Sequence, residues 1–269
     1  MKKIIEINNL SFRYKSKFVF DKFNLSINEG EWLSIVGPNG SGKTTLIKLI
    51  IGLLPSDNCI KIDDLILNKD NLAHVRKRIS ILFESDTNYF VGETVAEEIA
   101  FPLENLAYSQ SEMQKMVHRI ADLLKISHLL DKDPATLSGG EKQKVALASA
   151  LVSNPKILIM DGNLEMVDTN TKKEIFNLLE QLNKNKSLTV INFSRNLDEV
   201  YHADRLVIIK DGSILIDGPI KTVLKEDKIF NRIGIEVPFM VDLSIKLQLY
   251  ALIDKMIFNM DEMVDVLWQ

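Results

Sequence analysis

Several residue types that mark particular protein classes are scarce in this chain. Cys59 is the single cysteine among 269 residues, which excludes an intramolecular disulfide framework and a cysteine-based zinc site. Basic residues are not in excess: 33 lysines and arginines face 37 acidic residues, and the net charge of −4 gives no sign of a nucleic-acid partner. The longest apolar run, Leu46–Leu54, is interrupted by Lys48 and falls far short of the roughly 20 residues that cross a bilayer. We therefore expect a soluble chain that reaches a membrane only through a partner.

What the chain does contain is an alternation of strand and helix patterns. Apolar runs beside turn residues predict strands, and a 3.6-residue periodicity predicts helices between them. The predicted strands are residues 32–36, 79–83, 156–160, 188–193 and the hairpin 205–216, with short strands over 4–36; the predicted helices are 44–54, most of 95–153, and the tail 230–269. This alternation predicts an α/β fold with a mainly parallel core sheet.

A glycine-rich segment between a predicted strand and a predicted helix carries the strongest chemical signal. Residues 37–44 read Gly-Pro-Asn-Gly-Ser-Gly-Lys-Thr and fit the phosphate-loop pattern G-x-x-x-x-G-K-[ST]. The glycines let backbone N–H groups turn toward an anion, and the following helix adds the positive end of its dipole. Lys43 is expected to reach the outer phosphates and Thr44 to hold Mg²⁺. The segment predicts nucleoside triphosphate binding, but a kinase or a GTPase would share it.

A second anion-binding pattern lies further along the chain. Leu137-Ser138-Gly139-Gly140-Glu141 precedes an apolar helical stretch, so the Ser-Gly-Gly run would stand at a helix N-terminus. Two phosphate-binding elements so far apart suggest that one serves the chain's own site and the other a site on a neighbouring chain.

Together these motifs resemble those of the ATP-binding-cassette (ABC) ATPases, over residues 3–225. The resemblance implies a P-loop ABC ATPase that binds ATP and Mg²⁺, with two cassettes facing head to tail. Asp161 matches the Walker B aspartate that positions the metal together with Thr44, and Asp168 matches the D-loop aspartate. Leu137 to Glu141 match the signature that acts in trans. The matching nucleotide-binding residues are Tyr14 (which would stack on adenine), Gly37, Asn39, Gly40, Ser41, Gly42, Lys43, Thr44 and Thr45.

The resemblance also implies a division of the chain. The nucleotide-binding α/β core, with an antiparallel β subdomain, is expected in residues 1–83 and 156–228. An inserted helical subdomain with the signature is expected in 84–155, and a C-terminal helical dimerisation extension in 229–269.

A narrower resemblance is to the ATPases of energy-coupling-factor (ECF) transporters, which import vitamins and metal ions. The segment Phe90–Val95, the following Ile99-Ala100-Phe101, and the tail from Ile233–Phe239 to Leu267-Trp268-Gln269 are similar to the first of their two ATPase paralogues. The resemblance implies a second ATPase subunit as partner, a membrane coupling subunit, a substrate-binding membrane subunit, and a place on the cytoplasmic face of the membrane. The segment 86–90 is the expected contact with the coupling subunit.

Three positions depart from the family pattern, all around the hydrolytic centre. Gly162 stands where the family has the glutamate that polarises the attacking water, and Arg195 where it has a histidine. Glu84 replaces the Q-loop glutamine. No catalytic residue is therefore assigned, and we expect the chain's own site to bind ATP with impaired hydrolysis. Glu84 and Arg195 could pair near the terminal phosphate, Glu84 could take the metal while Arg195 takes the phosphate, or the two could never meet.

Two other functions stay open. The chain could be an ABC-type switch that binds ATP outside transport, or an active homodimeric transport ATPase that uses another base, such as Glu165. The transported substrate cannot be read from this chain.

Overall fold

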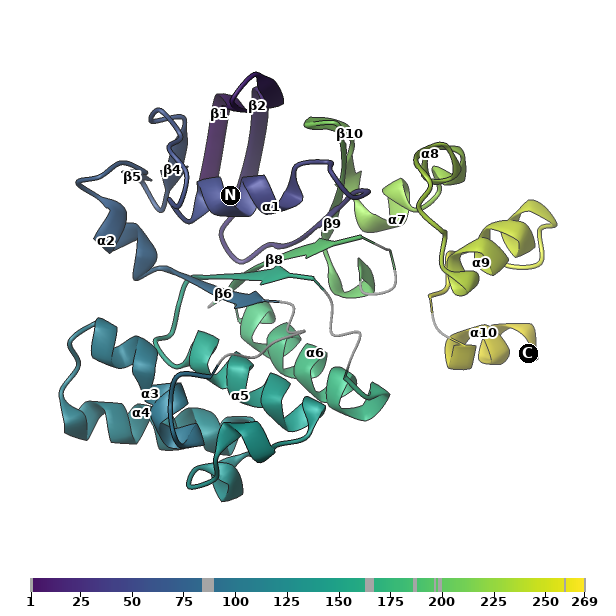
Figure 1. Cartoon of the computed structure of the whole chain (residues 1–269). Helices are drawn as coiled ribbons and strands as arrows, with labels where there is room; N and C mark the ends of the chain where they lie inside the picture. The colour runs from purple at the N-terminus through teal and green to yellow at the C-terminus, as the bar shows by residue number, and fades with distance from the viewer. Residues whose placement is uncertain are drawn as a thin grey trace.

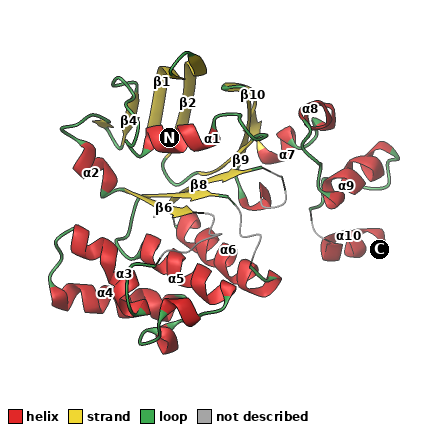
Figure 2. Cartoon of the chain, viewed as in Figure 1, coloured by secondary structure: helices red, strands yellow, loops and turns green. Residues whose placement is uncertain are grey.

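The structure is a computed structural model, and it describes residues 2–83, 90–162, 167–185, 188–195, 197, 200–258 and 260–268. Two sheets and the helix between them form the upper part of the molecule in Figure 1, a layer of helices lies below, and the C-terminal helices stand to one side. Figure 2 shows the same division, with the strands gathered in the upper half.

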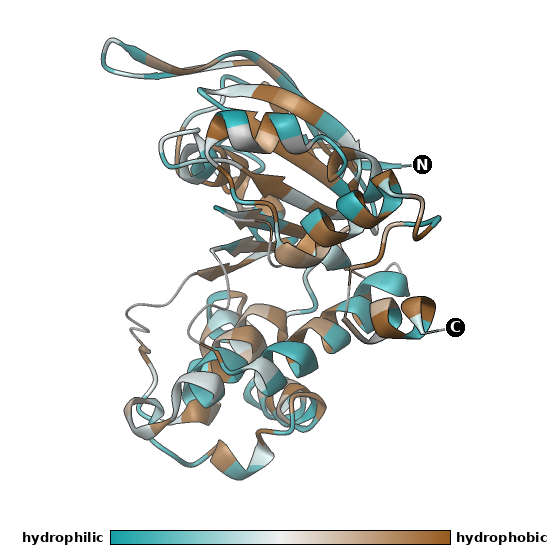
Figure 3. Ribbon diagram, turned by 90° about the vertical axis from the view of Figure 1, so that its right-hand side faces the viewer, coloured by the Kyte–Doolittle hydropathy of each residue, from teal (hydrophilic) through white to brown (hydrophobic). Residues whose placement is uncertain are grey.

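The central sheet has six strands in the order β10-β9-β3-β8-β7-β6. All neighbours pair in parallel except β10, which pairs with β9 antiparallel. The strands are β3 (Trp32–Val36), β6 (Ile79–Phe83), β7 (Ile157–Asp161), β8 (Thr189–Ser194), β9 (Arg205–Lys210) and β10 (Ser213–Pro219). Both β3 and β8 are buried along their whole length, because both faces of the sheet are covered. Figure 3 accordingly colours the interior strands mostly brown. The predicted mainly parallel core is confirmed.

A second, antiparallel sheet has the order β2-β1-β4-β5. Its strands are β1 (Lys3–Tyr14), β2 (Lys17–Asn28), β4 (Ile60–Ile62) and β5 (Leu65–Ile66). The expectation of short strands before β3 was wrong, because β1 and β2 are each 12 residues long. Register shifts interrupt their pairing at several points, so the apolar alternation changes phase and suggests shorter pieces.

Helix α1 (Lys43–Ile50) packs in a buried cluster with both sheets. It ends before the predicted limit at residue 54, because Gly52 takes a left-handed conformation with φ 68°. The short helix α2 (Leu72–Arg76) leads into β6.

The other face of the central sheet carries the helical layer. It consists of α3 (Val95–Asn105), α4 (Gln110–Leu123), α5 (Gly139–Leu151) and α6 (Thr169–Lys184), with 3₁₀ turns η1 (Ser127–Leu129) and η2 (Pro134–Thr136). One buried cluster joins these helices to the sheet. The predicted helical stretch of residues 95–153 is confirmed, broken at the 3₁₀ turns.

The C-terminal part is helical, as predicted. After η3 (Val200–His202) and the β9–β10 hairpin come α7 (Ile220–Val223), α8 (Asp227–Ile233), α9 (Phe239–Leu249) and α10 (Met260–Leu267). The exposed apolar side chains Phe239, Leu249 and Trp268 lie here. None of the helices in the described part of the chain is long and apolar enough to cross a membrane.

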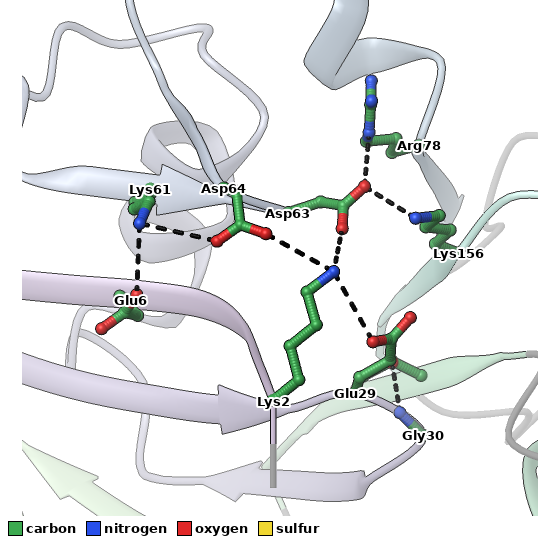
Figure 4. A network of polar contacts seen from close by, with 10 residues as sticks. Lys2, Glu6, Glu29, Gly30, Lys61, Asp63, Asp64, Arg78 and Lys156 are labelled. Carbon is green, nitrogen blue, oxygen red and sulfur yellow. Dashed lines mark hydrogen bonds and ion pairs between the residues drawn. The ribbon is translucent and has the colours of Figure 1, made fainter.

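A network of ion pairs joins the two sheets at the amino ends of the parallel strands (Figure 4). The buried carboxylate of Asp63, which follows β4, accepts hydrogen bonds from Lys2, Arg78 and Lys156 at 2.7 to 2.9 Å. Lys2 precedes β1, Arg78 precedes β6 and Lys156 precedes β7. One carboxylate therefore fixes three strand beginnings relative to one another.

Candidate functional site

An open cavity of about 560 Å³ lies over the carboxyl ends of β3, β7 and β8. This is an ordinary size for a site that binds a nucleotide-sized ligand. It extends to the far end of the β1–β2 hairpin and to the β9–β10 turn. The lining residues are Tyr14, Lys17, Phe18, Val19, Asn39, Gly40, Ser41, Gly42, Lys43, Thr44, Thr45, Asp161, Gly162, Phe193, Ser194, Arg195, Asp211 and Gly212.

The phosphate loop forms the floor of this cavity between β3 and α1. The loop turns with Gly40 at φ 79° and Gly42 at φ 108°, conformations that glycine adopts without strain. An added side-chain carbon at Gly42 would lie 2.8 Å from the ring of Phe20, so the loop also has no room there. The hydroxyl of Ser41 is buried and has no hydrogen-bond partner among the described residues. The loop thus combines a buried hydroxyl that has no partner among the described residues with a helix N-terminus at the cavity, and the helix N-terminus suits an anionic ligand.

The ammonium group of Lys43 folds back over this loop. It donates to the carbonyl oxygens of Gly37 at 2.5 Å and Pro38 at 3.2 Å. Burial lowers the pKa of Lys43, the positive charge of Arg195 lowers it further, and Asp161 opposes both. Two cations therefore share this end of the cavity, and an anion placed there would relieve their repulsion.

Asp161 ends β7 beside the loop, with Thr44 on the wall of the same cavity. Burial raises the pKa of the Asp161 carboxyl, and Lys43 and Lys48 offset this only in part. A carboxylate that lacks full compensation and a threonine in the wall of the same cavity provide the kind of oxygen ligands that Mg²⁺ prefers. The described residues contain no cluster of three or more metal-binding side chains, so phosphate oxygens and water would have to complete the shell.

The two departures that fall on described residues lie together at this end. The amide of Gly162 donates to the carbonyl oxygen of Phe193 at 3.0 Å, and φ at Gly162 is 90°. Any other residue would be strained in this conformation. Arg195 follows β8 directly, lines the cavity with an exposed side chain, and stands between the strands that lead to Gly37 and Gly162.

Several predicted residues lie outside the described part of the chain. These are Glu84, most of the expected coupling contact at 86–90, and the alternative base Glu165. The pairing of Glu84 with Arg195 therefore stays a prediction.

The signature segment lies away from the cavity, at the start of α5 in the helical layer (Figure 1). The Ser138 amide and hydroxyl donate to Glu141 Oε2 at 2.8 and 2.7 Å, and this pairing lowers the pKa of Glu141. Such a capping box fixes the first turn of the helix. Gly139 is exposed and Gly140 half-buried, whereas Leu137 is buried and anchors the segment.

The signature and the D-loop aspartate meet on one surface. A side-chain carbon added at Gly140 would come within 3.2 Å of Asp168 Oδ2 and of the Thr171 hydroxyl. Asp168 caps α6, with Oδ1 accepting from the amides of Asn170 and Thr171. Backbone and side-chain hydrogen bonds from Thr171 lower the pKa of Asp168. This surface does not share the cavity of its own chain, as a role in trans requires.

Seven residues of the cavity wall were not predicted as site residues: Lys17, Phe18, Val19, Phe193, Ser194, Asp211 and Gly212. The hairpin turn at 210–212 was predicted, but nothing local to it indicates that it touches the phosphate loop. Phe18 and Tyr14 both line the cavity, so two aromatic residues lie at this end. The guanidinium of Arg13 lies 5.9 Å from the ring centre of Phe18.

Comparisons with known proteins agree with this geometry. Residues 20–164 match the family model described as ABC transporter. The chain is 39% identical over 250 residues to the energy-coupling factor transporter ATP-binding protein EcfA1 of Leuconostoc mesenteroides, covering 92% of each chain. It is 34% identical over 270 residues to the protein of that name from Mesomycoplasma hyopneumoniae, covering 99% of this chain and 98% of the other.

Solved structures show the same fold. The cbiO1 protein of Clostridium perfringens, described as part of the ABC transporter complex cbiONQ, superimposes with a TM-score of 0.77 at 27% identity, covering 90% of this chain and 99% of the other. The cassette MJ0796, solved as a dimer bound to ADP and Pi, gives a TM-score of 0.70 at 27% identity, covering 80% and 98%.

Proposed function

Because the chain belongs to the ABC transporter family, and within it to the ATP-binding proteins of energy-coupling factor transporters, we propose that its own site binds and holds ATP while its signature completes the site of a partner cassette. The chain is an ATP-binding subunit of such a transporter. The observation that carries the finer proposal is that Lys43, Thr44 and Asp161 line one end of a cavity together with Gly162 and Arg195.

The orientation of the nucleotide follows from the two ends of the cavity. The exposed aromatic rings of Tyr14 and Phe18 offer stacking surfaces for the base. The phosphate loop and Lys43 offer N–H donors and positive charge for the phosphates at the other end. Thr44 and Asp161 would hold Mg²⁺, which when bound neutralises charge on the outer phosphates.

Hydrolysis at this site lacks an evident base. Gly162 carries no side chain, and the guanidinium of Arg195 offers N–H donors but no acceptor. Asp161 and Asp211 are the carboxylates among the described residues that line the cavity, and Asp161 is needed for the metal. Loss of a general base costs about 10²- to 10⁴-fold in rate. Arg195 would instead bind the terminal phosphate through its planar donor fork and favour retention of ATP.

A partner cassette supplies the active site in this proposal. Ser138, Gly140 and Asp168 would face the nucleotide of a second, hydrolytically competent ATPase subunit in a heterodimer. Membrane coupling and substrate-binding subunits would complete the transporter on the cytoplasmic face of the membrane, with the 86–90 segment near the coupling subunit. ATP binding would close the two cassettes, and hydrolysis at the partner's site would open them.

The test is ATP hydrolysis by the complex purified from membranes with its partners. Ser138→Ala should slow hydrolysis although the chain's own cavity is untouched. Equal activity with and without this change would contradict the trans role. Two other results would favour the alternative functions. Vigorous ATPase activity of the isolated chain that is lost in Glu165→Ala would favour an active homodimer. Failure to purify with any membrane protein would favour a switch outside transport.

A further inference from the structure

The turn between β9 and β10 forms a wall of the nucleotide cavity. The amide of Gly212 donates to the carbonyl oxygen of Ser41 in the phosphate loop at 3.1 Å. Asp211 and Gly212 also line the cavity that contains Lys43. A segment far from the phosphate loop in sequence is thus bonded to the loop's backbone.

The hairpin packs closely against two segments, strand β2 and the phosphate loop. A side-chain carbon at Gly212, whose φ is 73°, would collide with the carbonyl oxygen of Val19 in β2. One at Gly37 would collide with the carbonyl oxygen of Ile209. Backbone therefore packs directly on backbone at both places, and the position of β9 fixes the position of the phosphate loop.

One face of strand β9 shares a buried cluster with the C-terminal helices. Ile208 pairs with Val36, the residue before the phosphate loop, and both are fully buried. They belong to a buried cluster that also contains Phe230 of α8, Val241 of α9 and Met256. The opposite face of β9, with Val207 and Ile209, belongs to the cluster of α1. Strand β9 thus lies between the C-terminal helices and the helix that follows the phosphate loop.

We infer that β9 and its turn to β10 position the phosphate loop, and that the packing of the C-terminal helices against β9 thereby sets how tightly the cavity binds nucleotide. This inference rests on the proposed function, because it concerns the same site. Linkage makes the effect reciprocal: nucleotide in the cavity stabilises the packing of the C-terminal helices. Gly212 and Ile208 act through the loop and are positioning residues.

Two methionines of the C-terminal part provide a matched test. Met256 is 8% exposed and belongs to the cluster of Val36 and Ile208, whereas Met263 is 1% exposed and belongs to a separate cluster with Ile253 and Ile257. Each is changed to alanine in the full chain, and a fluorescent ATP analogue is titrated with Mg²⁺. Met256→Ala should weaken binding about fivefold or more, and Met263→Ala less than about twofold. Equal effects of the two changes would overturn the inference.

Hydrogen exchange on the unaltered chain gives a second measurement that needs no variant. Saturating ATP with Mg²⁺ should slow exchange of the Gly212 amide and of amides in α9, but not of those in α4. Protection confined to the phosphate loop and α1 would also overturn the inference. If the unaltered chain binds no ATP at all, the proposed function itself fails; if it binds ATP but the methionine variants do not differ, only the coupling through β9 fails.

Discussion

Two aspartates at opposite ends of the central sheet have opposite electrostatic surroundings. Burial by itself would raise the pKa of Asp63, but hydrogen bonds from Lys156, Lys2 and Arg78 hold it well below its ordinary value. Burial does raise the pKa of Asp161, because Lys43 and Lys48 compensate only in part. The fully paired carboxylate of Asp63 stabilises the fold, whereas the partly compensated carboxylate of Asp161 can still bind a cation together with a ligand.

The largest expected effect comes from removing the negative charge of Asp63. Asp63→Asn leaves three cations around a neutral amide, which should lower the free energy of unfolding by about 3 kcal/mol. Urea denaturation measures this. Asp64→Asn is the control, because that side chain is 68% exposed and its ion pairs should contribute less than about 0.5 kcal/mol. Similar losses of unfolding free energy in both variants would show that the ion pairs of Asp63 contribute no more to stability than those of the exposed Asp64.

At the cavity, Lys43→Ala should weaken nucleotide binding about 100-fold, because a charged donor to the phosphates is lost. Calorimetric titration with ATP and Mg²⁺ measures the change. Lys48→Ala is the control, since this exposed lysine lies on the same helix and does not line the cavity. Unchanged affinity of Lys43→Ala for ATP would contradict the proposal that this end of the cavity binds the phosphates.

Acid should erase the contribution of Asp63. Because the folded-state pKa of Asp63 is depressed, its stabilisation is complete above the ordinary carboxyl pKa near 4 and is lost as the pH falls toward the folded-state value. The stability difference between the unaltered chain and Asp63→Asn should therefore shrink by about 1.4 kcal/mol for each pH unit below about 4. Denaturation midpoints of both proteins between pH 7 and pH 3 provide the measurement, and a constant difference would contradict the ion-pair account.

The smallest effect has the opposite sign. The pKa of Asp161 is raised, so its ionised form opposes folding at neutral pH and this cost disappears as the pH falls through the raised pKa. Asp161→Asn should consequently stabilise the nucleotide-free chain by about 1 kcal/mol while it weakens Mg²⁺-dependent ATP binding. A less stable variant would mean that Asp161 already has the compensation it needs in the folded chain.

The parallel strands of the central sheet could be predicted because each is a short, mainly apolar run, and this is a property of its own residues. The phosphate loop could be predicted for the same reason, since glycine spacing and the following helix are local properties of residues 37–44. The lengths of β1 and β2 could not, because shifts of register against a neighbouring strand change the phase of the apolar pattern.

By itself, therefore, the sequence determined the family, the phosphate-binding loop, and the absence of a side chain at Gly162. Only the tertiary structure decided that Arg195 lines the cavity beside Lys43, that the Asp211–Gly212 turn bonds to the phosphate loop, and that Gly140 meets Asp168. The physical reason is the same in each case. A loop motif depends on the conformational freedom of its own residues, whereas a contact between distant segments depends on which strands pair and which faces the helices cover.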